Sequence, residues 1–165
     1  MKSLLAISSF ACALFLLAST AHADSKKDDI ASYIKDLKRG NAKTRATAAK
    51  ELGNIGAVSA ADTKDAVPLL IELLKNDRDK GVKQAAATAL GRIDPDPEKA
   101  VPVLITALKD KNAAVRAAAA TSLGQLGTEA KDAVPALRTA QDDKDRGVSR
   151  AARMAIRTIQ GQNKK

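Results

Sequence analysis

Aromatic side chains, cysteine and histidine are almost absent from this sequence. Its 165 residues include no Trp, one Tyr, two Phe, one Cys and one His. Both Phe, the Cys and the His lie within residues 1–23, which leaves Tyr33 as the only aromatic residue beyond them. Without Cys–His or Ser–His pairs, the remaining chain lacks the usual activated nucleophiles and the nitrogen and sulfur ligands of zinc. We therefore expect no metal and no cofactor, and no stacking platform for nucleic-acid bases.

The acidic residues do not replace the missing catalytic groups. Adjacent pairs such as Asp28–Asp29 and Asp142–Asp143 fall at predicted turns or helix starts. Carboxylates at these places cap helix N-termini and offset the helix dipole. General acid–base catalysis and calcium binding are the alternatives, and the acidic turn 94–98 is short of the ligands that a calcium loop needs. The sequence therefore predicts a protein that is not an enzyme.

Residues 1–23 have the pattern of a secretory signal peptide. One basic residue precedes an apolar run over 4–17, and Ala21 and Ala23 form an A-x-A cleavage site ahead of Asp24. An uncleaved membrane anchor is one alternative, which the short and serine-interrupted run disfavours. A lipoprotein modified at the single cysteine is another. We expect export to a bacterial periplasm or secretion, with no stable transmembrane segment after cleavage.

One sequence unit recurs four times after this leader. In the clearest copy, 100–127, two apolar stripes at helical spacing flank the polar residues 110–112. This pattern predicts two short helices folded back on each other. Pro68, Pro102 and Pro135 mark the first helix of successive copies, at nearly equal steps along the chain. A fixed period the length of one helical hairpin predicts a solenoid, in which stacked neighbours supply the core that no single hairpin has.

The recurring patterns V-R-x-x-A-A-x-A-L-G-x-L-G and A-V-P-x-L-I-x-x-L resemble HEAT-like repeats of the short type also found in phycobilisome lyases. The resemblance implies an all-α fold, a right-handed α-solenoid of four helical hairpins with about eight helices. Tetratricopeptide and ankyrin repeats have similar periods, but their aromatic and T-P-L-H signatures are missing here. We expect a signal peptide at 1–23, a repeat domain at 24–160 and a disordered tail at 161–165, with repeats at about 28–56, 64–93, 98–127 and 131–160.

The first and last copies depart from the pattern. Asp36 and Glu51 stand where later copies have apolar or small residues that face a neighbouring repeat. This favours an N-terminal cap, with ordinary divergence as the alternative. In the last copy, four positions that elsewhere meet the next repeat become polar: Arg138, Gln141, Arg153 and Arg157. Both ends thus favour a complete array of four repeats. The longer link at 57–64 predicts a bend or small loop where the solenoid flexes.

Basic residues recur at one position of the repeat. With 28 Lys and Arg against 19 Asp and Glu, the chain carries a formal net charge of +9. The position that opens each second helix is basic in three copies and is followed by an arginine in the fourth. Stacking brings equivalent positions within about 8–10 Å of each other, which predicts a row of cations along one face. We call these residues the basic row: Arg45, Lys83, Arg116, Arg150, Lys50 and Arg92, with Lys43 beside them.

Two interpretations of the basic row remain open, and they can coexist. The cations can pair with acids in adjacent turns and hold the repeats together, or they can bind a partner. The acids available for pairing are Asp77, Asp79, Asp110 and Asp145.

Three classes of function compete. The first is an exported interaction module, whose concave, partly basic face of second helices binds an acidic protein or an anionic envelope surface. The second is nucleic-acid binding, which the charge favours but the missing aromatics and the expected export disfavour. The third, implied by the resemblance alone, is a chromophore lyase or chaperone. A tetrapyrrole needs a roomy aromatic-lined pocket, which one tyrosine cannot supply. We predict the first class, a non-enzymatic protein–protein interaction scaffold.

Overall fold

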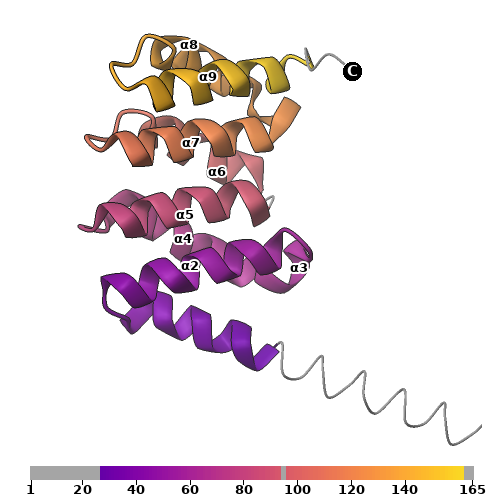
Figure 1. The fold of residues 1–165 in the computed structure, drawn as a ribbon. Helices are drawn as coiled ribbons and strands as arrows, with labels where there is room; N and C mark the ends of the chain where they lie inside the picture. The colour runs from indigo at the N-terminus through magenta and orange to yellow at the C-terminus, as the bar shows by residue number, and fades with distance from the viewer. Residues whose placement is uncertain (1–26, 94–95, 162–165) are drawn as a thin grey trace, which may run out of the picture.

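Helical hairpins stack one upon the next along the chain (Figure 1). The computed structural model describes residues 27–93 and 96–161, and these ranges contain no strand. The prediction of an all-α chain is confirmed for them. The expected leader, 1–23, and its cleavage site at Ala21, Ala23 and Asp24 lie outside the described residues, as does most of the expected tail.

Four helical hairpins make up the stack, and each has a first and a second helix. The first helices are residues 27–39, α4 (Val67–Asn76), α6 (Pro97–Ala107) and α8 (Val134–Ala140). The second helices are α2 (Ala42–Gly56), α5 (Lys80–Ile93), α7 (Ala113–Gln125) and α9 (Arg146–Ile159). Two connections are also helical: α3 (Ala60–Thr63) with the 3-10 turn η1 (Lys64–Ala66), and the 3-10 helix η2 (Gly127–Ala133).

Side-chain caps fix where the second helices begin. Asn41, Asn112 and Asp145 are N-caps whose side-chain oxygens accept hydrogen bonds from backbone N–H groups of the first turn. Asp79 accepts from the backbone N–H groups of Gly81 and Val82 in the same way. These bonds satisfy N–H groups that have no partner within the helix. The polar turn before each second helix is therefore what separates the two helices of a hairpin.

The second helices form one layer, in which α2 packs on α5, α5 on α7 and α7 on α9. The first helices α4, α6 and α8 lie behind this layer and pack less closely on one another. Glycine allows the close approach: a Cβ built on Gly91 would lie 2.6 Å from Ser122 Cα, and one on Gly124 would lie 3.0 Å from Ala155 Cα. The larger side chains of the core lie between the two layers, fully buried at Leu52, Leu70, Leu90, Leu104, Leu123 and Leu137.

The link between the first and second hairpins is more ordered than its sequence suggests. Residues 57–64, expected to be a bend or small loop, include the helical turn α3. Thr63 is fully buried, and its hydroxyl donates to the Ala60 carbonyl at 3.3 Å. The extra length of this link therefore folds back against the end of α2 instead of forming an open loop.

None of the helices in the described ranges is long and apolar enough to cross a membrane.

Candidate functional site

Three cations of the basic row make ion pairs from one repeat to the next. Each lies near the start of a second helix, and each meets an aspartate in the turn that follows the first helix of the next repeat. The Arg45 Nε–Asp77 Oδ2 distance is 2.7 Å, and Lys83 Nζ lies 2.9 Å from Asp110 Oδ2. Arg116 Nε lies 2.7 Å from Asp143 Oδ2. We call the three acids the turn aspartates: Asp77, Asp110 and Asp143.

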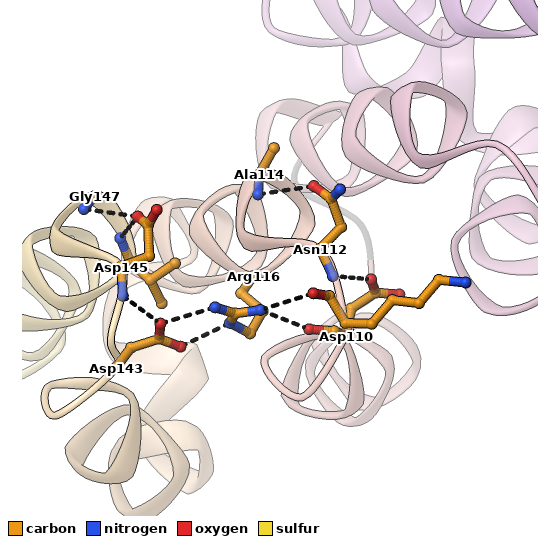
Figure 2. A network of polar contacts seen from close by, with 9 residues as sticks. Asp110, Asn112, Ala114, Arg116, Asp143, Asp145 and Gly147 are labelled. Atoms are coloured by element: carbon orange, nitrogen blue, oxygen red, sulfur yellow. Dashed lines mark hydrogen bonds and ion pairs between the residues drawn. The ribbon is translucent and has the colours of Figure 1, made fainter.

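The junction between the third and fourth hairpins has the most extensive polar network (Figure 2). Arg116 donates two hydrogen bonds to the Asp143 carboxylate, at 2.7 and 2.8 Å. Its Nη1 also donates to the carbonyls of Asp110 and Lys111, at 2.9 and 3.3 Å. Asp143 accepts a further bond from the backbone N–H of Asp145, the residue that caps α9. One guanidinium thus joins two consecutive turns.

Burial and charge shape the protonation of the turn aspartates. The hydrogen bond from Arg116, with the backbone N–H of Asp145 and nearby cations, lowers the pKa of Asp143. For Asp77, burial acts to raise the pKa, but the hydrogen bond from Arg45, the backbone N–H of Asp79 and the surrounding cations outweigh it and the pKa is lowered. Burial also acts to raise the pKa of Asp110, but the hydrogen bonds from the backbone N–H of Asn112 and from Lys83 outweigh it and the pKa is lowered. These carboxylates are ionised at neutral pH and hold neighbouring repeats together.

The six residues of the basic row therefore do not form one continuous row. They divide into a linking set of three, a second set of Lys50 and Arg92 with Lys43 beside them, and Arg150 on its own. Arg45, Lys83 and Arg116 serve as links between repeats, with acids beside them. Of the acids expected to pair, Asp79 and Asp145 cap helices instead. Asp143 takes the place expected for Asp145, because the period of the repeat puts it at the point of the turn that Asp110 occupies one copy earlier.

The second set lines a groove between α2 and α5, which we call the basic groove. It has a volume of about 390 Å³, and its floor consists of small residues such as Gly53 and Ala89. Three exposed cations lie along it: Lys43, Lys50 and Arg92. Its lining also includes Thr47, Gln84 and Thr88.

The cations of the basic groove differ from the linking set because they have no carboxylate partner among the described residues. Arg92 donates to the side-chain oxygen of Asn54, which carries no charge. The groove thus combines free positive charge with polar groups and a floor that a backbone can approach closely.

Arg150, the sixth residue of the basic row, lies on a different groove. This groove runs between α7 and α9 and is lined also by Thr121, Gln125 and Met154. Arg150 is exposed and follows Ser149, which occupies the position of Arg116 in the fourth copy. Met154 is 54% exposed, and sequence reasoning did not single it out. Its equivalents are Lys50, Thr88 and Thr121, so the repeat alignment places it on the exposed side of the second helices.

Clusters of three or more His, Cys, Asp or Glu that could hold a metal ion do not occur in the described ranges. The basic groove offers cations, hydroxyls and an amide around a floor of small residues.

Solved structures with the same fold include engineered and natural repeat proteins. An engineered protein aligns with a TM-score of 0.67 at 26% identity, covering 79% of this chain and 62% of that one. A designed armadillo repeat protein in complex with the peptide (KR)4 aligns with a TM-score of 0.64 at 19% identity, covering 77% and 62%. This chain thus spans less than two thirds of the length of both engineered relatives.

The complex of CpcE and CpcF of phycocyanin lyase from Nostoc sp. PCC7120 is also similar, with a TM-score of 0.61 and 26% identity over 80% of this chain and 78% of that one. No curated protein sequence matches the chain. The HEAT repeat family matches residues 30–100 and 67–157, which together exceed half of the sequence. The stacked hairpins and this match agree: the chain belongs to the HEAT repeat family.

Proposed function

We propose that this protein is an exported, non-enzymatic scaffold that binds an acidic segment of a partner protein in the basic groove. The observation that carries the proposal is the charge state of the groove. Lys43, Lys50 and Arg92 lie exposed around it with no carboxylate beside them in the described chain, whereas Arg45, Lys83 and Arg116 are already paired. The cations of the basic groove are thus available to bind a ligand.

The lining of the basic groove suits an extended acidic peptide. Its floor of glycine and alanine admits a backbone, and the Gln84 amide can donate to a peptide carbonyl and accept from a peptide N–H. Lysine and arginine at the edges attract carboxylates, which speeds the encounter and makes binding sensitive to salt. The same groove would repel a basic peptide.

The experiment is a fluorescence-anisotropy titration of the protein against a labelled peptide of alternating Glu and Ala. We expect binding that weakens as salt is added, and no binding of the matching Lys–Ala peptide. The double variant K50E/R92E should weaken binding at least about tenfold, since it reverses two of the three groove charges. The control K64E/K131E makes the same change in net charge at two exposed positions outside the groove. Equal loss in both double variants would contradict a site in the groove.

We also propose that the stack forms a right-handed superhelix with the second helices on its concave side. Close packing within the second-helix layer supports the curvature, because the layer with smaller spacing lies inside a curved stack. A crystal structure with several copies of the chain would test the handedness and the curvature directly.

Export to a periplasm or outside the cell is part of the same proposal, supported by the leader pattern of residues 1–23. Mass spectrometry of the purified protein should give a mature N-terminus at Asp24. Recovery of the chain with its leader intact would contradict cleavage.

A second candidate is a role as a chromophore lyase or chaperone, favoured by the similarity to the CpcE–CpcF complex. A coloured adduct after incubation with a bilin and an apo-phycobiliprotein would support it. A third candidate is binding to nucleic acid or to an anionic envelope surface, favoured by the net charge of +9. Retention on DNA or on anionic vesicles at physiological salt, unchanged in K50E/R92E, would favour that candidate over the groove.

A further inference from the structure

The junctions inside the stack follow one register. In each, a glycine of one second helix lies against a small residue of the next: Gly53 against Ala89, Gly91 against Ser122, and Gly124 against Ala155. The Ser122 hydroxyl also donates to the Ala87 carbonyl at 2.7 Å, so the small residue lies near two positions of the preceding helix.

At the two ends of the stack, the positions that would form this contact carry charged residues, and the two ends have opposite signs. The glycine position of Gly91 and Gly124, carried forward into the last copy, becomes Arg157 in α9, and the Ala87 position becomes Arg153. The small-residue position becomes Glu51 in α2. The side chains of the two arginines are exposed and make no hydrogen bond or ion pair with other described residues. Glu51 is half-buried and accepts one bond, from Asn54 Nδ2 at 3.2 Å.

These charges lie at opposite ends of the molecule. The first hairpin, with α2, forms one end of the stack, and α8 with α9 forms the other (Figure 1). If a second copy placed its first hairpin on α9 in the register of the internal junctions, its Glu51 would lie beside Arg153 and Arg157. The internal geometry thus predicts which side chains of the two ends would meet.

We propose that copies of this chain associate head to tail, with Glu51 of one copy between Arg153 and Arg157 of the next. The occupant of the C-terminal end is a second copy, since the complementary carboxylate stands at the matching position of the chain itself. The contact joins different surfaces of the two copies, so each pair keeps one unused surface of each kind, to which further copies can add.

The contact differs from an internal junction in strength. A Cβ at the glycine position of Gly124 would lie 3.1 Å from the Ala155 Cβ, so Arg157 and Glu51 force two helices further apart than in the stack. The ends therefore meet through long charged side chains and bury little apolar surface. Association through such a contact is reversible and depends on salt.

Sedimentation velocity tests this proposal, with protein purified after the whole chain is expressed. At about 20 mM salt we expect the weight-average mass to rise with concentration, up to about 1 mM protein, and to return to that of the monomer at about 500 mM salt. E51R and the double variant R153E/R157E should each weaken self-association about tenfold. An equimolar mixture of these two variants should associate again, because the reversed charges are complementary between them.

The controls are E129R and the double variant K64E/K131E, which match the two reversals in charge at exposed positions of the connections between repeats. Thermal unfolding followed by circular dichroism confirms that each variant is folded. If E51R does not fold, R153E/R157E alone carries the test, since both arginines are exposed. A protein that stays monomeric at low salt and high concentration overturns the proposal. So does self-association that the end-face reversals and their controls reduce equally, or a mixture of variants that stays monomeric.

Discussion

Removing the Asp143 carboxylate should destabilise the protein far more than an ordinary surface change. The substitution Asp143→Ala deletes both hydrogen bonds that Arg116 makes to the next repeat. The Arg116 side chain is 9% exposed and the Asp143 side chain 12%, so the guanidinium would keep its charge without a carboxylate and with little access to water. Loss of one partner of a buried pair costs about 3–5 kcal/mol.

We expect the lower end of this range, about 3 kcal/mol, because two backbone carbonyls still accept from Arg116 Nη1. For a domain of this size, that corresponds to a fall in Tm of about 10 °C. The double variant R116M/D143A should recover much of the loss, since methionine retains an apolar stem and removes the unpaired charge. The single variant should therefore be less stable than the double.

Urea unfolding followed by circular dichroism measures these differences. Asp142→Ala is the matched control, because Asp142 precedes Asp143 in the same turn and its side chain is exposed. The control should change the free energy of unfolding by less than about 0.5 kcal/mol. If Asp143→Ala lowers the free energy of unfolding no more than this control does, water screens the ion pair and the prediction is wrong. It is also wrong if R116M/D143A is less stable than D143A.

Three further predictions concern the core, the junction glycines and pH. Leu123→Ala should lower the free energy of unfolding by about 2–5 kcal/mol in urea denaturation, because the side chain is fully buried, and an equal cost at exposed Val58→Ala would contradict this. Gly91→Ala should lower the Tm measured by calorimetry, because the new Cβ would lie 2.6 Å from Ser122 Cα. The control Gly81→Ala, at the start of α5, should leave the Tm nearly unchanged, because its Cβ meets only the Asp79 carboxylate, at 3.0 Å. The pKa values of the turn aspartates are lowered in the folded chain, so their stabilisation is complete above the unfolded pKa of about 4 and is lost as the pH falls below it. Denaturation at a series of pH values should therefore show stability falling below about pH 4, and a smaller fall in D143A.

The helical hairpins could be predicted from sequence because their signals are local and repeated. Pro68 and Pro135 lie in the first turns of α4 and α8, and the spacing of leucines marks the buried stripes. Pro102 lies inside α6 instead, because that helix begins five residues earlier, at Pro97. The short helix α3 carried no comparable signal. Ser59, before it, makes no side-chain cap, and the turn is held by burial of Thr63 beside Gly56 at the end of α2. A contact of this kind exists only after the chain has folded.

The candidate site was predicted in part. The alignment of Arg45, Lys83 and Arg116 identified the cations that link repeats, and the acids at Asp77 and Asp110 were among those expected. Asp143 occupies the position of Asp110 in the next copy of the repeat, so the repeat alignment would also have identified it. The separation of the basic groove from the linking set was harder to predict. Lys50 follows Arg45 by more than one helical turn, which rotates it to another side of α2, and whether that side is open depends on how closely α5 approaches.

The uniform junctions have a consequence for how such a chain can change length. Each internal boundary reuses one glycine-to-small-residue contact, and its linking cation meets a turn aspartate 27 or 32 residues further on. A duplicated segment equivalent to α6 and α7, inserted between α5 and α6, would present a compatible partner at both of its borders. Lengthening from within therefore needs no new interface, and recombination between repeats can produce longer or shorter arrays while each fold boundary stays satisfied.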